Sequence, residues 1–93
     1  MKNMDKWFNK KDLKSLKEGD IIRHIVWGNE SRTKVFFDGI SVLKSNSNNI
    51  LKLDVIERKS GDWNDYILFL DKIETNDDFY YMGKKEEYPE YFI

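Results

Sequence analysis

The chain contains no cysteine, one proline, one histidine and five dispersed glycines among its 93 residues. Without cysteine it can form neither a disulfide nor a thiolate metal site, which fits an intracellular protein. The glycines form no phosphate-binding loop. No apolar run is long enough to cross a bilayer, and the lysine-rich start lacks the apolar core of a secretory signal. We therefore expect a cytoplasmic domain that does not enter the membrane.

The groups that most enzymes use are also scarce. His24 is the only histidine and lies between apolar neighbours, so we interpret it as a structural residue. No Gly-x-Ser-x-Gly motif marks a nucleophile. The acids Glu74, Asp77 and Asp78 lack the spacing of a calcium loop, and a solvated turn explains them better. The sequence predicts a protein that is not an enzyme and uses no metal or cofactor.

Charge is nearly balanced overall but unevenly spread along the chain. The net charge is −1, yet residues 1–17 hold six Lys and two Asp, and residues 71–93 hold seven acids and three Lys. One interpretation is that the two ends are solvated and attract one another. The other is that the basic start binds an anionic ligand or partner. The net negative charge argues against nucleic acid as the partner.

Aromatic residues are plentiful: three Trp, five Tyr and six Phe supply enough large side chains for a core in a chain this short. We expect one domain, residues 1–93, with a helical segment 1–19, a β core 20–82 and a polar, aromatic tail 83–93. The predicted fold class is α+β, mostly β. An N-terminal helix is followed by about five antiparallel strands that form a compact sheet or small barrel.

The helix is predicted from residues typical of helix ends. Asp12 is a suitable N-cap, Leu13 and Leu16 share one face, and Gly19 suits the left-handed residue that ends a helix. An earlier group at helical spacing leaves open whether there is one helix or two. This group is Met4, Trp7 and Phe8.

Runs rich in β-branched and aromatic residues predict the strands. Ile21–Trp27 is largely apolar on both faces and is expected to be central. Asp38–Gly39 lies between two apolar runs and predicts a tight hairpin turn, because such a turn needs positive φ at both central residues. Ser45–Asn49 predicts a second turn. The runs with strand composition are 21–27, 33–37, 40–43, 50–57, 66–70 and 78–82.

The candidate binding residues centre on Trp27, at the end of the first of these strands. Alternation places Arg23 on the same face, about 13 Å away at about 3.3 Å per residue. A guanidinium there could meet a phosphate while the indole stacks on a base. Asn29 follows in a turn, and Trp63 lies in a Gly-Asp-Trp-Asn loop. The alternative interpretation places Trp27 in the core, with Arg23 extended to its rim.

The segment Leu16–Gly19, followed by Arg23 and Trp27 at intervals of four residues, resembles the opening of the anti-Thoeris sponges, a family of small phage anti-defence proteins. The stretch 70–79 resembles the family's closing segment, in which an acidic helical turn leads into a short strand. The chain departs from the family at His24, where a second basic residue is usual. It also departs at residue 79, a phenylalanine where tryptophan is usual.

The resemblance implies a compact sheet with a helix that assembles into homo-oligomers. It also implies tight capture, without turnover, of cyclic ADP-ribose-type signals or cyclic dinucleotides. Trp27 would stack on a base, Arg23 would face phosphate or ribose oxygens, and Asp77 or Asp78 would accept hydrogen bonds from hydroxyls. Together, the residues themselves and the resemblance predict a site of Arg23, Trp27, Asn29, Trp63, Asp77 and Phe79.

Three functions follow as hypotheses. The first is a non-catalytic, phage-type anti-defence protein that sequesters a cyclic nucleotide-type signalling molecule. The second is a small protein–protein inhibitor or adaptor that blocks a host defence protein through Trp63 and the tail Tyr88–Ile93. The third, a nucleic-acid binder, is opposed by the net charge. Its phosphate contacts would be Lys10, Lys11, Lys14 and Lys17.

Overall fold

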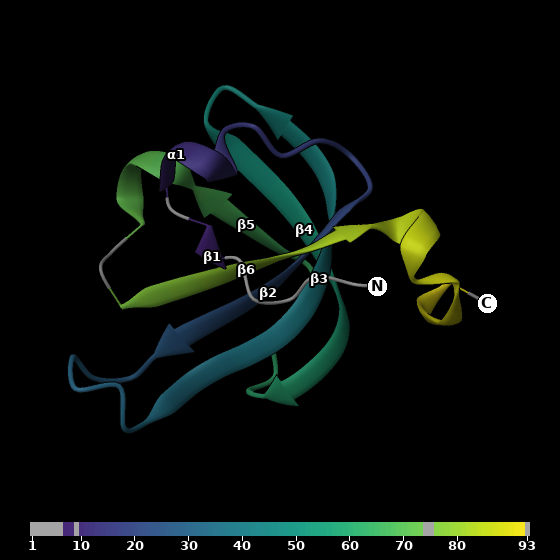
Figure 1. Ribbon diagram of the computed structural model, residues 1–93. Helices are drawn as coiled ribbons and strands as arrows, with labels where there is room; N and C mark the ends of the chain where they lie inside the picture. Colours follow the sequence, from purple (N-terminus) through teal and green to yellow (C-terminus); the bar gives the residue numbers. More distant parts are fainter. Residues whose placement is uncertain (1–6, 9, 74–75, 93) are drawn as a thin grey trace.

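One antiparallel sheet forms the body of the protein (Figure 1), as seen in a computed structural model that describes residues 7–8, 10–73 and 76–92. Its strand order is β1-β6-β2-β3-β4-β5, and all neighbouring pairs are antiparallel. The prediction of a mostly β, antiparallel fold is confirmed. The strands are β1 Trp7–Phe8, β2 Asp20–Trp27, β3 Val35–Ser47, β4 Ile50–Ser60, β5 Tyr66–Phe69 and β6 Asp77–Lys84. The helical segments are α1 Lys10–Leu13, η1 Leu70–Lys72, η2 Lys85–Glu87 and η3 Pro89–Tyr91.

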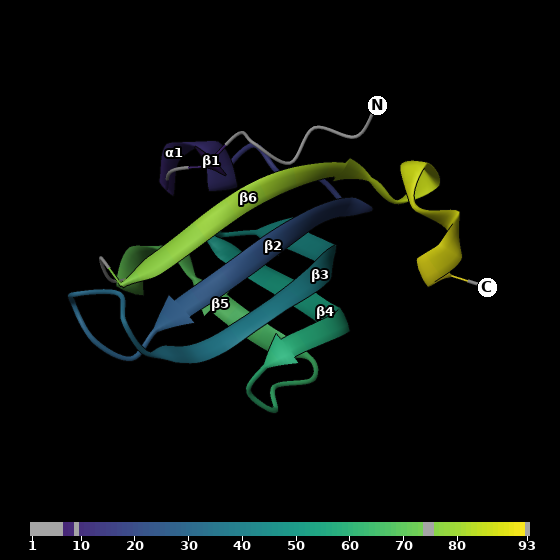
Figure 2. The ribbon, with the colours of Figure 1, turned by 60° about the horizontal axis from the view of Figure 1, so that its bottom comes forward.

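The sheet curls because its two longest strands pair irregularly. The register between β3 and β4 shifts at Asp38/Gly39, at Ile40/Ser41 and at Leu43/Ser45. Such bulges bend a strand and increase its twist. As a result β4 and β5 lie behind β2 and β6 (Figure 2). The two edge strands, β1 and β5, do not pair with one another in the described part of the chain, so the curl stays open.

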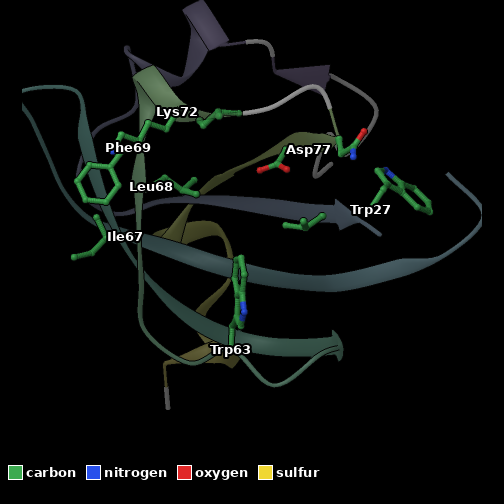
Figure 3. A pocket seen from close by; sticks show the side chains of 10 residues that line it. Trp27, Trp63, Ile67, Leu68, Phe69, Lys72 and Asp77 are labelled. Carbon is green, nitrogen blue, oxygen red and sulfur yellow. The ribbon is translucent and has the colours of Figure 1, made fainter. Parts of the chain in front are cut away.

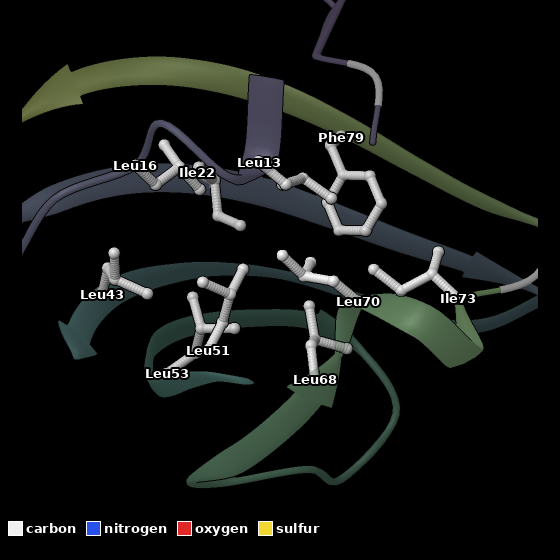
Figure 4. Packing of buried hydrophobic residues seen from close by; sticks show 10 residues of the cluster. All are labelled: Leu13, Leu16, Ile22, Leu43, Leu51, Leu53, Leu68, Leu70, Ile73 and Phe79. Atoms are coloured by element: carbon white, nitrogen blue, oxygen red, sulfur yellow. The ribbon is translucent and has the colours of Figure 1, made fainter. Parts of the chain in front are cut away.

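The main hydrophobic core fills the inside of this curl (Figure 4). Leu13 of α1 and Leu16 of the following loop enter it from one side of the sheet. Ile22 and Phe79 face them from β2 and β6, and leucines of β3, β4 and β5 close the opposite side. The buried members are Leu13, Leu16, Ile22, Leu43, Leu51, Leu53, Leu68, Leu70, Ile73 and Phe79.

A smaller cluster lies on the outer face of the sheet. There the C-terminal segment packs its buried Tyr88 against Ile21, Ile40, Val42 and Met82. The Tyr88 hydroxyl donates to the carbonyl oxygen of Met82 at 2.8 Å. The segment after β6 is therefore anchored on the body of the protein, and Ile93 lies outside the described residues. None of the helices in the described ranges has the length and apolar character to span a membrane.

The predicted N-terminal helix is not confirmed. α1 is a single turn that ends at Leu13, and Asp12 lies inside that turn rather than at its N-cap. Gly19 does adopt positive φ, +91°, but in a turn: its N–H donates to Leu43 and its carbonyl accepts from Lys85. Bonds to β3 and to the segment after β6 thus replace the bonds that would continue a helix. The chain near Met4 lies outside the described residues.

Trp7 and Phe8 were expected in a helical turn but form strand β1, paired with Tyr80 and Phe79 of β6. Helical spacing of so few residues does not distinguish a turn of helix from a short edge strand. The pairing adds a sixth strand beside β6. β1 pairs with the edge of β6 opposite the one that pairs with β2.

The predicted hairpin turn at Asp38–Gly39 is also wrong, because both residues lie inside β3. Asp38 forms an ion pair, and a Cβ at residue 39 would lie only 2.6 Å from Cζ of Phe37, so the glycine makes room for a ring. The tight turn of the β3–β4 hairpin is instead Asn48–Asn49, within the second predicted turn. There φ is 53° and 61°, values that asparagine tolerates better than most residues.

Candidate functional site

A cleft of about 320 Å³ opens where the curled sheet fails to close (Figure 3). Its walls are the end of β2, the loop between β4 and β5, strand β5 with η1, and the start of β6. Among the residues that the structure describes, two indoles, one cation and one carboxylate lie in this lining with mostly apolar neighbours. The lining residues that bear on recognition are Trp27, Trp63, Ile67, Phe69, Lys72 and Asp77.

Trp27 is the last residue of β2 and borders the cleft together with Val26, at the point where the register between β2 and β3 shifts. The indole N–H of Trp27 donates to Oδ2 of Asp78 at 2.8 Å, and its backbone N–H donates to Asn76 at 2.8 Å. Arg32 also donates to Asp78, with Nε 3.0 Å from Oδ2. The hydrogen bond from Arg32 is the main reason that the pKa of Asp78 lies below its ordinary value, and the hydrogen bond from Trp27 lowers it further. The indole is therefore held in place at the rim.

Trp63 forms the opposite side of the cleft and is half-buried. Its ring stacks on Phe37, with centroids 4.7 Å apart and an interplanar angle of 21°, and contacts Tyr66 at 5.0 Å. Arg58 donates to its carbonyl oxygen at 3.3 Å. One side of this indole is thus packed against the inner face, while the residue also lines the cleft.

Asp77 lies at the back of the cleft and is held from inside the protein. Its Oδ2 is 3.0 Å from Nε2 of His24, whose Nδ1 is 3.0 Å from the hydroxyl of Tyr66. The imidazole is fully buried and stacks on Phe79 with centroids 4.4 Å apart. Burial raises the pKa of Tyr66 well above its ordinary value. The structural role predicted for His24 fits these contacts, and the histidine adds a polar connection to the cleft.

Lys72 supplies the positive charge of the cleft. Its Nζ lies 5.7 Å from the ring centroid of Phe69, a cation–π distance. No described carboxylate lies within ion-pair distance of this ammonium. The lysine is also one of the residues that line the cleft.

The structure brings together three of the six predicted site residues. Trp27, Trp63 and Asp77 line one cleft. Phe79 lies beneath it, buried against His24, and makes no part of the lining. Asn29 is in the β2–β3 loop, where its Oδ1 accepts from the backbone N–H groups of residues 33 and 34 and stabilises that turn.

Arg23 does not share the cleft with Trp27, so that part of the prediction is wrong. Its side chain lies on the outer face and forms a bidentate ion pair with Asp38, at 3.0 and 2.7 Å. This hydrogen bonding raises the pKa of Arg23. The indole of Trp27 bonds Asp78, which pairs with Ile25, so Arg23 and Trp27 keep the common face that alternation predicted. The cleft lies at the end of the strand, where Trp27 borders it and Arg23 does not.

Sequence reasoning missed Lys72, Asn76 and the polar partners Ser41 and Tyr66. Alternation along β2 already placed His24 on the face of Ile22, a signal for a polar group directed into the core. No spacing in the sequence connects β2 with β5 and β6, however. Only the curl of the sheet brings those partners together.

A scan against protein-family models, a search of curated proteins and a search of solved structures each found no match. The resemblance to the anti-Thoeris sponges therefore stays a prediction.

Proposed function

We propose that this protein captures a small nucleotide-type ligand in the cleft between Trp27 and Trp63 and sequesters it without converting it. The observation that carries the proposal is the composition of the cleft: its described lining holds two indoles and, as charged groups, Lys72 and Asp77. Pockets for small molecules combine aromatic walls with a few such polar groups. A flat heteroaromatic ring with an anionic substituent matches this lining.

Each group has a role that its chemistry supports. An exposed indole surface stacks on a base, a contact worth about 1–3 kcal/mol. The Lys72 ammonium binds phosphate with charge-assisted hydrogen bonds. Asp77 accepts hydrogen bonds from N–H or O–H groups. The role that the resemblance assigned to Arg23 passes to Lys72, because Asp38 occupies the guanidinium of Arg23.

The volume of the cleft favours a small ligand. Ligand pockets span about 300–1,000 Å³, and about 320 Å³ lies at the lower end of that range. One base with its sugar and one phosphate is a better match than two stacked bases. We therefore place mononucleotide-sized signals ahead of cyclic dinucleotides.

Capture without turnover is supported by the burial of His24. Both of its ring nitrogens are bonded within the protein, to Tyr66 and to Asp77. A histidine in this position is separated from a ligand by the carboxylate and cannot reach a substrate directly. Its contacts suit support of the cleft better than proton transfer to a ligand.

Ligand binding is tested by thermal shift and by quenching of tryptophan fluorescence. Cyclic mononucleotides, nucleoside monophosphates, cyclic ADP-ribose isomers and cyclic dinucleotides are the probes. A ligand at a hundred times its Kd stabilises the folded state by about 2.7 kcal/mol. Lys72→Ala is expected to weaken binding, and Lys59→Ala, which removes an exposed lysine paired with Glu57, serves as the matched control. Absence of both signals with every probe would overturn the proposal.

The second candidate function is inhibition of a partner protein, favoured by exposed apolar side chains near the cleft. Phe36 is 57% exposed, Ile67 49% and Phe69 48%. Large exposed apolar groups of this kind are typical of interaction surfaces. Tyr88, by contrast, is buried and unavailable as an anchor. Phe36→Ser is expected to abolish binding to a host partner and to spare nucleotide binding.

The same exposed residues suit contact with a second copy of the chain, so a homo-oligomer stays part of the proposal. Light scattering over a range of concentrations measures the assembly. Phe36→Ser and Phe69→Ser are expected to shift it to the monomer. A wild-type protein that is monomeric throughout would remove the oligomer and leave ligand capture unaffected.

A further inference from the structure

A line of hydrogen-bonded polar side chains crosses the inner face of the sheet and ends at the cleft. The Ser41 hydroxyl lies 3.3 Å from that of Tyr66, which is 3.0 Å from Nδ1 of His24. Nε2 of His24 is 3.0 Å from Oδ2 of Asp77. Ser41 and His24 are fully buried, whereas the Asp77 side chain is 14% exposed. Only the last member reaches the cleft.

The carboxylate at one end of this line fixes the direction of its last hydrogen bond. A carboxylate only accepts, so Nε2–H of His24 donates to Oδ2 of Asp77. Tyr66 remains a phenol because burial disfavours its ionised form. Its hydroxyl both donates and accepts, so it can satisfy Nδ1 of His24 and the Ser41 hydroxyl together. The line therefore holds the Nε2–H donor of His24 on Asp77.

A buried line of polar groups lowers the stability of the fold when any member lacks a partner. When complete, it adds little stability beyond what apolar packing would give. Around it, the rings of Phe37 and Phe79 pack against His24 with centroids 6.1 and 4.4 Å away. These neighbours would accept an apolar residue in its place. The line does have one effect that packing cannot supply, since it holds Oδ2 of Asp77. Among the described residues no hydrogen bond reaches the other oxygen, Oδ1.

We propose that the Ser41–Tyr66–His24 line makes Oδ1 of Asp77 a fixed hydrogen-bond acceptor, so that the cleft selects nucleotides that present an N–H or O–H donor to it. This inference rests on the proposed function and specifies its ligand. Asp77 contacts the ligand. His24 and Tyr66 are positioning residues, which act through Asp77.

The decisive variant is Asp77→Asn, which keeps the shape of the side chain and reverses its function. Nε2–H of His24 would bond the amide oxygen, so that the amide N–H₂ faces the cleft. The acceptor then becomes a donor. A merely structural role for Asp77 predicts weaker binding of all ligands alike, whereas the proposed role predicts a reversed preference.

Three probes distinguish the possible donors on the ligand: adenosine monophosphate, purine riboside monophosphate without the exocyclic amine, and deoxyadenosine monophosphate without the ribose hydroxyl. The wild type is expected to bind the probe that lacks the recognised donor about tenfold to a hundredfold more weakly than adenosine monophosphate, the value of one hydrogen bond to a charged group. In Asp77→Asn this order disappears or reverses. Asp71→Asn, an exposed carboxylate on η1, is the control and is expected to keep the wild-type order.

The outcomes separate the two proposals. If the wild type binds none of the nucleotides used to test capture, these three included, both the proposed function and the selectivity are overturned. If it binds others but none of these three, the selectivity is overturned and capture stands. If it binds all three equally, or Asp77→Asn keeps the wild-type order, the selectivity alone is overturned and capture stands.

The histidine gives a readout that needs no ligand. Because His24 is the only histidine, its ring nitrogens give a single set of signals in a ¹⁵N NMR spectrum. We expect a proton on Nε2 in the wild type, and a change at Nδ1 in Tyr66→Phe together with weaker discrimination among the probes. A wild type without a proton on Nε2, or full discrimination in Tyr66→Phe, would contradict the proposed line.

Discussion

The two faces of the sheet use consecutive residues in opposite ways. On β2, Arg23 points outward to Asp38 and His24 points inward to Asp77. The outer pair is bidentate, with both carboxylate oxygens bonded by the guanidinium. The inner pair uses one oxygen of Asp77, and no hydrogen bond among the described residues reaches the other. A charged pair that satisfies itself stabilises the fold, whereas one that leaves an acceptor open can also recognise a ligand.

Two neighbouring residues of strand β6 show the same contrast between the two faces of the sheet. Asp77 bonds His24 on the inner face, while Asp78 bonds Trp27 and Arg32 on the other side. Two neighbouring aspartates thus serve the same cleft in different ways. One presents a carboxylate to it, and the other fixes an indole at its rim.

The largest effect is expected from His24→Ala. The substitution leaves a cavity between Phe37 and Phe79 and removes the partners of Tyr66 and Asp77. Core truncation and unsatisfied polar groups together should lower the free energy of unfolding by about 3–5 kcal/mol. Urea unfolding monitored by circular dichroism measures it. A loss below about 1 kcal/mol would mean that the inner line is not a structural element.

A smaller effect is expected from Gly39→Ala, on the inner face of β3. The new Cβ would lie 2.6 Å from Cζ of Phe37 and 3.2 Å from the carbonyl oxygen of Glu57. Overpacking of this kind costs about 1–3 kcal/mol. Displacement of Phe37 should also shift Trp63, which stacks on it, so tryptophan fluorescence is expected to change along with the melting temperature. Unchanged stability would show that the ring moves freely.

The outer pair is tested by Arg23→Met, expected to cost about 1–2 kcal/mol because Asp38 loses its partner. The double variant Arg23→Met, Asp38→Leu should recover most of that loss, since an ion pair can often be replaced by apolar residues. Ligand affinity is expected to stay unchanged in both, because neither residue lines the cleft. Loss of ligand affinity in the double variant would show that Arg23 contributes to the site after all.

The smallest effect concerns pH and Asp78. Its pKa is lowered by Arg32 and Trp27, so the stability it contributes is present above the unfolded-state pKa and lost as the pH falls through the lower folded-state pKa. The wild type is therefore expected to be more stable than Asp78→Asn at neutral pH, and the difference should shrink below about pH 4. Thermal unfolding across this range measures it. A difference that grows in acid would contradict the assignment.

Local patterns in the sequence were enough for most of the sheet. β-Branched and aromatic runs predicted the positions of β2, β4, β5 and β6 within a few residues, because such runs bury their side chains in any sheet. The turn predicted at Asp38–Gly39 was wrong because the preference of this pair for a turn is a local property. Its place in a strand depends instead on tertiary contacts, with the ring of Phe37 and with Arg23. The prediction of a longer N-terminal helix failed for the same reason, since contacts with β3 and with the segment after β6 decide the conformation of residues 14–19.

The site was predictable only in part, for a related reason. Trp27, Trp63 and Asp77 are conspicuous residues at strand ends and in a loop, and those positions meet where the sheet stays open. Lys72 and Tyr66 have no such mark in the sequence. Their roles arise from the distance between β5 and β2 across the curl, which depends on bulges that no periodicity reveals.

The register shifts of the β3–β4 hairpin have a consequence for engineering. An extra residue in a strand sets its bend through the backbone, and in the described part of the chain β5 joins the sheet through β4 alone. The width of the cleft is thus encoded in residue count rather than in side-chain identity. Surface substitutions along the hairpin should leave that width intact, while insertion or deletion of one residue at Lys44, Ile56 or Lys59, the unpaired positions of the shifts, would reset it and with it the size of the molecule admitted.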